Sequence, residues 1–102
     1  MKWKVVPRPE VEDDILKAAK WYDRECAGLG DEFVEEVLAV FDALATDPLF
    51  QSQPHPTKNI RWRYPKRFPY RVVYEVLEDE HLVVIAAVIH ASRHDRVWRQ
   101  RF

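Results

Sequence analysis

Arginine and histidine side chains in the C-terminal half of this chain are the groups best suited to chemistry on an anionic substrate. Arg61, Arg63 and Arg71 lie in segments where apolar and polar residues alternate, and His90 ends an apolar run. A guanidinium group donates paired hydrogen bonds to phosphate or carboxylate, and histidine titrates close to neutral pH. If the fold brings these four side chains together, they predict a site that holds an anion and moves a proton.

Two apolar runs that carry Arg71 and His90 predict a β-hairpin. Residues 70–76 alternate with the period of two expected for a strand with one buried face. Residues 82–89 form a nearly unbroken Val/Ile/Ala run, typical of a central strand covered on both faces. A tight acidic turn joins the two runs and predicts a register with Arg71 opposite Val88. His90 then lies two residues further along the same face.

A third strand is expected over residues 58–64, where apolar and polar residues again alternate. A three-residue turn into the hairpin would pair Trp62 with Tyr70 and set Arg61 opposite Arg71. This register predicts one apolar face, toward the two helices expected in the N-terminal half, made by Trp62, Tyr70, Val72, Ile85 and Ala87. It predicts an opposite, basic face made by Arg61, Arg63, Arg71 and His90. An ordinary solvated face is the alternative; an anion site would explain why like charges gather there.

The N-terminal half predicts a short strand followed by two helices. Residues 2–6 form the strand, and Pro9 suits the first position of the first helix. The sequence Gly-Leu-Gly at 28–30 breaks the helical pattern, and a second amphipathic helix runs from about 32 to 45. Such a short break predicts an antiparallel helical hairpin. An irregular loop is expected over residues 50–56.

Composition limits the remaining possibilities. The chain has 102 residues, of which 47% are apolar and 32% charged, as expected for one globular domain spanning residues 1–102. It contains neither an apolar run near the ~20 residues of a membrane span nor a signal-peptide pattern. Cys26 is the only cysteine, which excludes an internal disulfide and favours a cytoplasmic setting. The four histidines are scattered along the sequence, so we expect no metal site. There is no glycine-rich phosphate loop, so we expect no nucleotide cofactor.

The order of one strand, two helices and three strands carries the motifs FPYRVVYEV, VVIAAVIHASR and a terminal RVW. This combination resembles the RelE/ParE family, the toxin halves of bacterial type II toxin–antitoxin pairs, and covers essentially the whole chain. The expected fold class is therefore α+β, with an antiparallel sheet packed on an N-terminal helical hairpin and a short basic C-terminal tail or helix. The resemblance implies a cognate antitoxin as partner, in a heterotetramer with the toxin.

The resemblance implies two effector mechanisms. Some members cleave mRNA on the ribosome, and others poison DNA gyrase without being nucleases. The nucleases use basic residues on the second strand, an arginine on the third, an arginine after the fourth and a C-terminal tyrosine. The second-strand position is matched by Arg61 and Arg63, the third-strand position by Arg71, and the position after the fourth strand by Arg93. Trp98 stands where the nucleases carry the tyrosine.

Because an indole has no ionisable hydroxyl, a nuclease built on this chain would need His90 for proton transfer. The prediction is an mRNA-cleaving toxin whose catalytic residues are His90, Arg71 and Arg61. The residues expected to bind RNA or another target are Arg63, Arg93, Arg96, Trp98 and Arg99. A gyrase poison, or a toxin-fold protein without activity, is the alternative.

Overall fold

The structure of this protein, a computed structural model, describes residues 2–93 and 96–101. Its elements are β1 (Lys4–Pro7), α1 (Pro9–Glu25), α2 (Leu29–Thr46), β2 (Gln53–Pro54), β3 (Ile60–Arg63), β4 (Tyr70–Leu77), β5 (Leu82–His90) and α3 (Arg96–Arg99). The predicted α+β fold is confirmed, and β2 is an additional short strand within the expected loop. No helix of this described part is long and apolar enough to cross a membrane.

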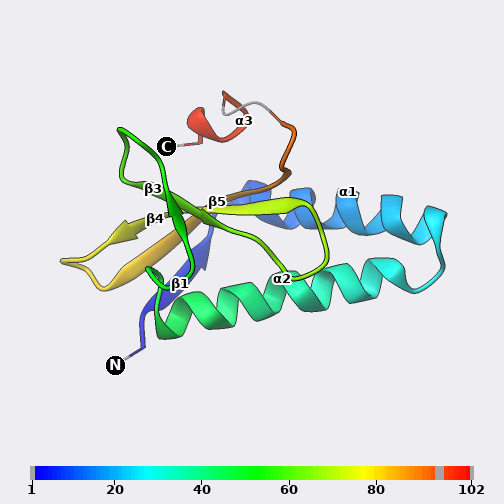
Figure 1. Cartoon of the computed structure of the whole chain (residues 1–102), viewed down its shortest axis with the longest axis horizontal. Helices are drawn as coiled ribbons and strands as arrows, with labels where there is room; N and C mark the ends of the chain where they lie inside the picture. Colours follow the sequence, from blue (N-terminus) through cyan, green and yellow to red (C-terminus); the bar gives the residue numbers. More distant parts are fainter. Residues whose placement is uncertain (1, 94–95, 102) are drawn as a thin grey trace.

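The five strands form one sheet in the order β1-β5-β4-β3-β2. β2, β3, β4 and β5 pair antiparallel, but β1 runs parallel to β5. The sheet is therefore mixed rather than wholly antiparallel. Parallel strands cannot be joined by a tight turn, and the connection between β1 and β5 includes both helices. The hairpin α1–α2 covers one face of the sheet and α3 lies over the other (Figure 1).

The turn between the two helices lies two residues earlier than the sequence pattern indicated, at residues 26–28. Gly28 adopts a left-handed conformation (φ 89°), and α2 begins immediately after it at Leu29. Gly30 thus lies inside the helix, where its N–H donates to Asp23 Oδ1 at 2.8 Å. A Cβ on Gly30 would clash with the backbone oxygen of Ala19 and lie 2.7 Å from Asp23 Cγ. Glycine at this position lets α2 approach α1 closely.

The larger core lies between the sheet and the helical hairpin. It includes Val11, Ala18, Phe33, Val37, Leu44, Phe68, Val72, Tyr74, Val76, Val83, Ile85 and Val88. Aromatic rings close its end nearest the β3–β4 loop, with centroids 4.8 Å apart for Tyr22 and Phe68 and 4.9 Å for Phe33 and Tyr70. Pairs of this kind contribute about 0.5–1.5 kcal/mol beyond the area that they bury.

A second, smaller core lies on the opposite face of the sheet, which the sequence pattern had predicted to be polar. Its buried members are Ile60, Val73, Ala87, Ile89 and Trp98, with Trp62 packed beside them. Trp98 comes from α3 and is fully buried. The basic C-terminal segment is therefore part of the folded domain, since its tryptophan covers the apolar centre of this face.

The register between β3 and β4 differs from the prediction. Trp62 pairs with Val73 and Arg63 with Val72, a shift of three positions from the expected register. The connection is longer than a tight turn because Phe68 is drawn into the main core, where it is 6% exposed. Side chains alternate between the faces of a strand, so an odd shift moves every β3 side chain to the other face. Trp62 consequently lies away from the helices.

A β-bulge changes the face of the last residues of β5. Tyr74 pairs with Ile85 as expected, but Val73 pairs with Ala87, which leaves Ala86 without a partner on β4. Beyond the bulge the register is displaced by one residue. His90 therefore lies opposite Tyr70, on the face toward the helices, and Ala87 moves to the second core. The predicted placement of both residues is wrong.

An ion pair ties the β3–β4 loop to α2. Arg67 Nε donates to Glu36 Oε2 at 2.5 Å, and its backbone N–H donates to Oε1 of the same carboxylate at 3.0 Å. Burial alone would raise the pKa of the Glu36 carboxyl, but the hydrogen bonds and charge of Arg67 outweigh it and hold that pKa below its usual range. A second carboxylate, Glu32, lies 3.5 Å from Arg67 Nη2.

The lowered pKa of Glu36 predicts an acid-sensitive contribution to stability. A carboxyl group whose pKa is lowered by folding contributes stability that is fully present above its unfolded-state pKa of about 4.3. That contribution is lost as the pH falls through the folded-state pKa. We expect Glu36→Gln to lower the urea midpoint at pH 7 and to make little difference near pH 3. Glu35→Gln, an exposed neighbour on α2, is the matched control. A Glu36→Gln deficit that is equal at both pH values would contradict this prediction.

Candidate functional site

The predicted cluster of three arginines and a histidine on one face does not form. Arg61 and Arg63 lie on β3, opposite residues of the main core, and therefore on the helical side of the sheet. Arg61 Nη1 donates to Ser52 Oγ at 2.9 Å, and Arg63 Nη1 donates to the carbonyl of Phe50 at 3.4 Å. Both guanidinium groups thus contact the loop before β2. Neither shares a face with Arg71, which reflects the shifted register.

Arg71 lies on the opposite face of the sheet and is only 8% exposed. Its Nη2 donates to the backbone carbonyl of Arg93 at 2.8 Å, and its guanidinium lies 5.5 Å from the ring centroid of Trp62. A buried guanidinium requires such partners, and a ring face offers one more. In this structure Arg71 fastens the chain that leaves β5 against the second core.

His90 lies on the helical side, at the end of β5. Its Nδ1 accepts the Ser92 N–H at 3.1 Å and lies 2.8 Å from Ser92 Oγ, so the proton of the neutral ring resides on Nε2. The ring meets that of Tyr70 edge-on, with centroids 5.3 Å apart. Burial raises the pKa of Tyr70 while the charge of Arg93 acts in the opposite sense. The Tyr70 hydroxyl therefore stays protonated near neutral pH.

A groove of about 370 Å³ runs beside His90, between α1 and the end of β5. Its lining includes Lys17, Trp21, Tyr70, His90, Arg93 and Arg101. Arg93 is the one predicted binding residue that the fold places beside His90. The groove combines positive charge with an aromatic rim, but Arg71 lies outside it.

The C-terminal segment carries three further predicted binding residues, Arg96, Trp98 and Arg99, while Arg63 lies apart from them on β3. Arg96 and Arg99 are exposed on α3, and the Arg99 guanidinium lies 6.0 Å from the ring of the buried Trp98. His55, from the loop after β2, meets the Trp98 ring edge-on at 5.8 Å. A helix of one turn is not stable in isolation. The buried tryptophan therefore determines where these two arginines project.

The placement of the predicted site residues fits the binding of an anionic surface better than proton transfer on a bound phosphate. Arg71 and His90 lie on opposite faces of the sheet, so the guanidinium and the imidazole do not face one common phosphate position. Across residues 2–93 and 96–101, no three His, Cys, Asp or Glu side chains converge to hold a metal ion. The roles assigned to the individual residues from the sequence stay predictions.

One polar pair that sequence reasoning missed joins α1 to the residues that follow α3. Arg101 Nη1 lies 2.6 Å from Asp14 Oδ2, and Nη2 lies 3.1 Å from Oδ1. Both side chains are largely buried, with exposed fractions of 16% for Arg101 and 14% for Asp14. Eighty-seven residues separate them, and no local pattern in the sequence marks such a pair.

The sequence matches a family model over residues 5–95, and that model describes the ParE toxin of the type II toxin–antitoxin system parDE. The chain belongs to this family. The match covers most of the chain, from the first strand to the segment after the last one. The family relation predicted from the sequence motifs is confirmed.

Solved structures share the fold of this ParE-family chain. The chromosomal ParDE system of P. aeruginosa matches with a TM-score of 0.75 at 11% identity, covering 87% of this chain and 96% of that one. The toxin–antitoxin complex RelBE2 of Mycobacterium tuberculosis matches at 0.63 and 20% identity, covering 88% and 99%. A mutant of E. coli toxin RelE in the free state matches at 0.62 and 13% identity, covering 99% and 95%. No curated protein sequence matches the chain.

The burial of Trp98 leads to a stability prediction. Trp98→Ala empties the centre of the second core, and we expect it to lower the free energy of unfolding by about 3–5 kcal/mol, the usual cost of truncating a buried aromatic residue. Trp21→Ala removes an indole that is 48% exposed and should cost less than about 1 kcal/mol. Urea unfolding measures both. Equal losses for the two variants would show that α3 does not pack on the sheet.

Proposed function

We propose that this chain is the toxin of a type II toxin–antitoxin pair and that it inhibits growth by binding DNA gyrase, not by cleaving mRNA. The effector surface in this proposal is the basic C-terminal segment, with Arg96 and Arg99 as the contacting side chains and Trp98 as their anchor. Family membership supports the toxin class, and gyrase is the target that the sequence resemblance offers for a member that is not a nuclease.

The separation of Arg71 from His90 is the observation that favours binding over cleavage. Cleavage through the ribose 2′-hydroxyl needs a group that transfers protons next to groups that stabilise the phosphate. Arg71 donates to the Arg93 carbonyl on one face of the sheet, whereas His90 is engaged with Ser92 on the other. Trp98 replaces the tyrosine of nuclease members and is fully buried. A nuclease that used Arg71 together with His90 would have to bring the two groups to one face of the sheet.

The charge distribution supports an anionic partner for the C-terminal half. Residues 1–48 contain six Lys/Arg and twelve Asp/Glu, while residues 49–102 contain ten and five. Interfaces use such asymmetry to steer association and to set the orientation of the partners. We propose that the antitoxin of this chain carries acidic residues against the same arginines and so competes with the target. Extended antitoxin segments suit a surface of this kind.

Charge removal on α3 tests the proposal. We expect the double substitution Arg96→Ala/Arg99→Ala to weaken gyrase inhibition by tenfold or more, because hydrogen bonds to charged groups contribute about 1.5–3 kcal/mol each. The matched control is Lys20→Ala/Arg24→Ala, which removes the same charge from exposed positions of α1. Growth after induction without a partner, and supercoiling by purified gyrase, are the two measurements.

His90→Gln separates the two mechanisms. For a gyrase poison this variant should inhibit growth as the wild-type chain does, with cellular message left intact in primer extension. For a nuclease it should lower cleavage by roughly 10²–10⁴, the usual contribution of a general acid or base. The contrary result has two parts: the wild-type chain arrests growth while cellular mRNA is cut, and His90→Gln relieves the arrest. That result would overturn the proposed mechanism in favour of mRNA cleavage.

A further inference from the structure

The edge of β5 extends past the end of β1, so some of its backbone groups have no partner strand there. β1 pairs with β5 only as far as Pro7 opposite Ile85, and the chain then turns away into α1. The bulge leaves Ala86, the next residue, without a partner on β4 as well. Backbone groups at the edge of a sheet need partners when they are buried. The carbonyl of Ala86 and the N–H of Val88 are such groups.

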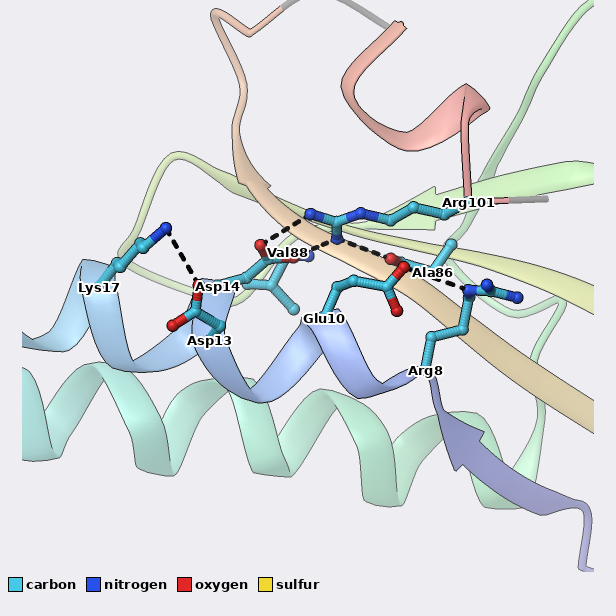
Figure 2. Close-up of polar contacts among 8 residues, drawn as sticks. All are labelled: Arg8, Glu10, Asp13, Asp14, Lys17, Ala86, Val88 and Arg101. Carbon is cyan, nitrogen blue, oxygen red and sulfur yellow. Dashed lines mark hydrogen bonds and ion pairs between the residues drawn. The ribbon is translucent and has the colours of Figure 1, made fainter.

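Asp14 and Arg101 supply both partners. Asp14 Oδ2 accepts the Val88 N–H at 3.1 Å, and Arg101 Nη1 donates to the Ala86 carbonyl at 2.9 Å. The two side chains also bind each other through two contacts, so one compact network joins α1, β5 and the end of the chain. In Figure 2 the Arg101 side chain reaches along β5 to Asp14, while the neighbouring Asp13 pairs with Lys17 away from the strand.

The same network limits the position of α3. Arg101 follows the helix closely, and its backbone N–H donates to the carbonyl of Trp98 at 3.0 Å. The C-terminal segment is therefore attached at two points, by the Trp98 ring in the second core and by the Arg101 guanidinium at the edge of β5. Arg99 lies between these points and Arg96 just before them.

We propose that Asp14 and Arg101 act as positioning residues for the toxin, holding α3 so that Arg96 and Arg99 are presented to the target in one fixed orientation. The inference rests on the proposed function of the C-terminal segment and adds two residues that need not touch the target. It also assigns α1, the first helix of the chain, a part in target binding.

Preorganisation is the physical reason to expect an effect on affinity. Arginine side chains and a mobile segment lose conformational freedom when they bind, and that loss weakens binding. A bidentate, largely buried ion pair removes most of that freedom before the target arrives. Without it the positive charges remain, but they sample many directions. We expect a loss of about tenfold in growth inhibition or target affinity when the pair is broken.

The experiment compares Arg101→Ala, Asp14→Asn and Arg101→Lys in the full chain. Arg101→Lys keeps one charged contact but cannot form the bidentate pair, so it should fall between wild type and Arg101→Ala. Asp13→Asn is the matched control, because it breaks an exposed ion pair one residue away. Growth inhibition reports function whatever the target is. Hydrogen exchange of the amides in 96–101 reports whether the segment has become mobile.

A second control separates positioning from simple loss of stability. Val37→Ala truncates a fully buried residue of the main core, away from the C-terminal segment. At a temperature where all variants are folded, it should inhibit growth as wild type does, even with a similar drop in Tm. The expected result is faster exchange in 96–101 and weaker growth inhibition for Arg101→Ala and Asp14→Asn, with a smaller effect for Arg101→Lys. The two controls, Asp13→Asn and Val37→Ala, should show neither change.

Two results would overturn the inference. One is wild-type growth inhibition by both Arg101→Ala and Asp14→Asn. The other is unchanged exchange in 96–101, which would show that Trp98 alone holds the segment. A wild-type chain that does not inhibit growth refutes the proposed function instead, and the exchange measurement still decides whether the pair orders α3.

Discussion

Burial of the central strands on both faces is the constraint on which the rest of this structure depends. β5 consists almost entirely of aliphatic residues, so neither of its faces can remain in water without a large hydrophobic cost. The helical hairpin covers one face through residues such as Ile85 and Val88. The other face requires a second cover, and the chain supplies it with Trp98 from its last helix. The basic C-terminal segment is ordered by this requirement.

Two local departures from regular pairing determine which side chains meet. The long β3–β4 connection exists because Phe68 is buried with the helices, and it moves Trp62 to the face of Arg71. The bulge at Ala86 moves His90 to the face of the helices. Each is an odd displacement in a structure whose side chains alternate with a period of two. Together they leave Arg71 on one face of the sheet and move Arg61, Arg63 and His90 to the other.

With Arg71 on the opposite face, this ParE-family chain does not present the arrangement of three arginines and a histidine that the sequence predicted. Arg71 is occupied with the backbone of Arg93 and with Trp62, a structural task. The exposed arginines lie on a short helix that has no stability of its own and depends on two anchors, Trp98 within it and Arg101 just after it. Binding through such a surface depends on how firmly it is held. For this reason the pair Asp14–Arg101 bears on the proposed binding even though neither residue needs to touch the target.

The sequence by itself determined the α+β class, the helical hairpin, the central apolar strands and the family relation, because these depend on periodicity and element order along the chain. It also indicated which residues carry charge near the C-terminus. Only the tertiary structure decided the parallel pairing of β1, the face on which Trp62 and His90 lie, and the contact of Asp14 with Arg101. These features depend on loop length, on a single bulged residue and on groups 87 positions apart, none of which leaves a periodic signal in the sequence.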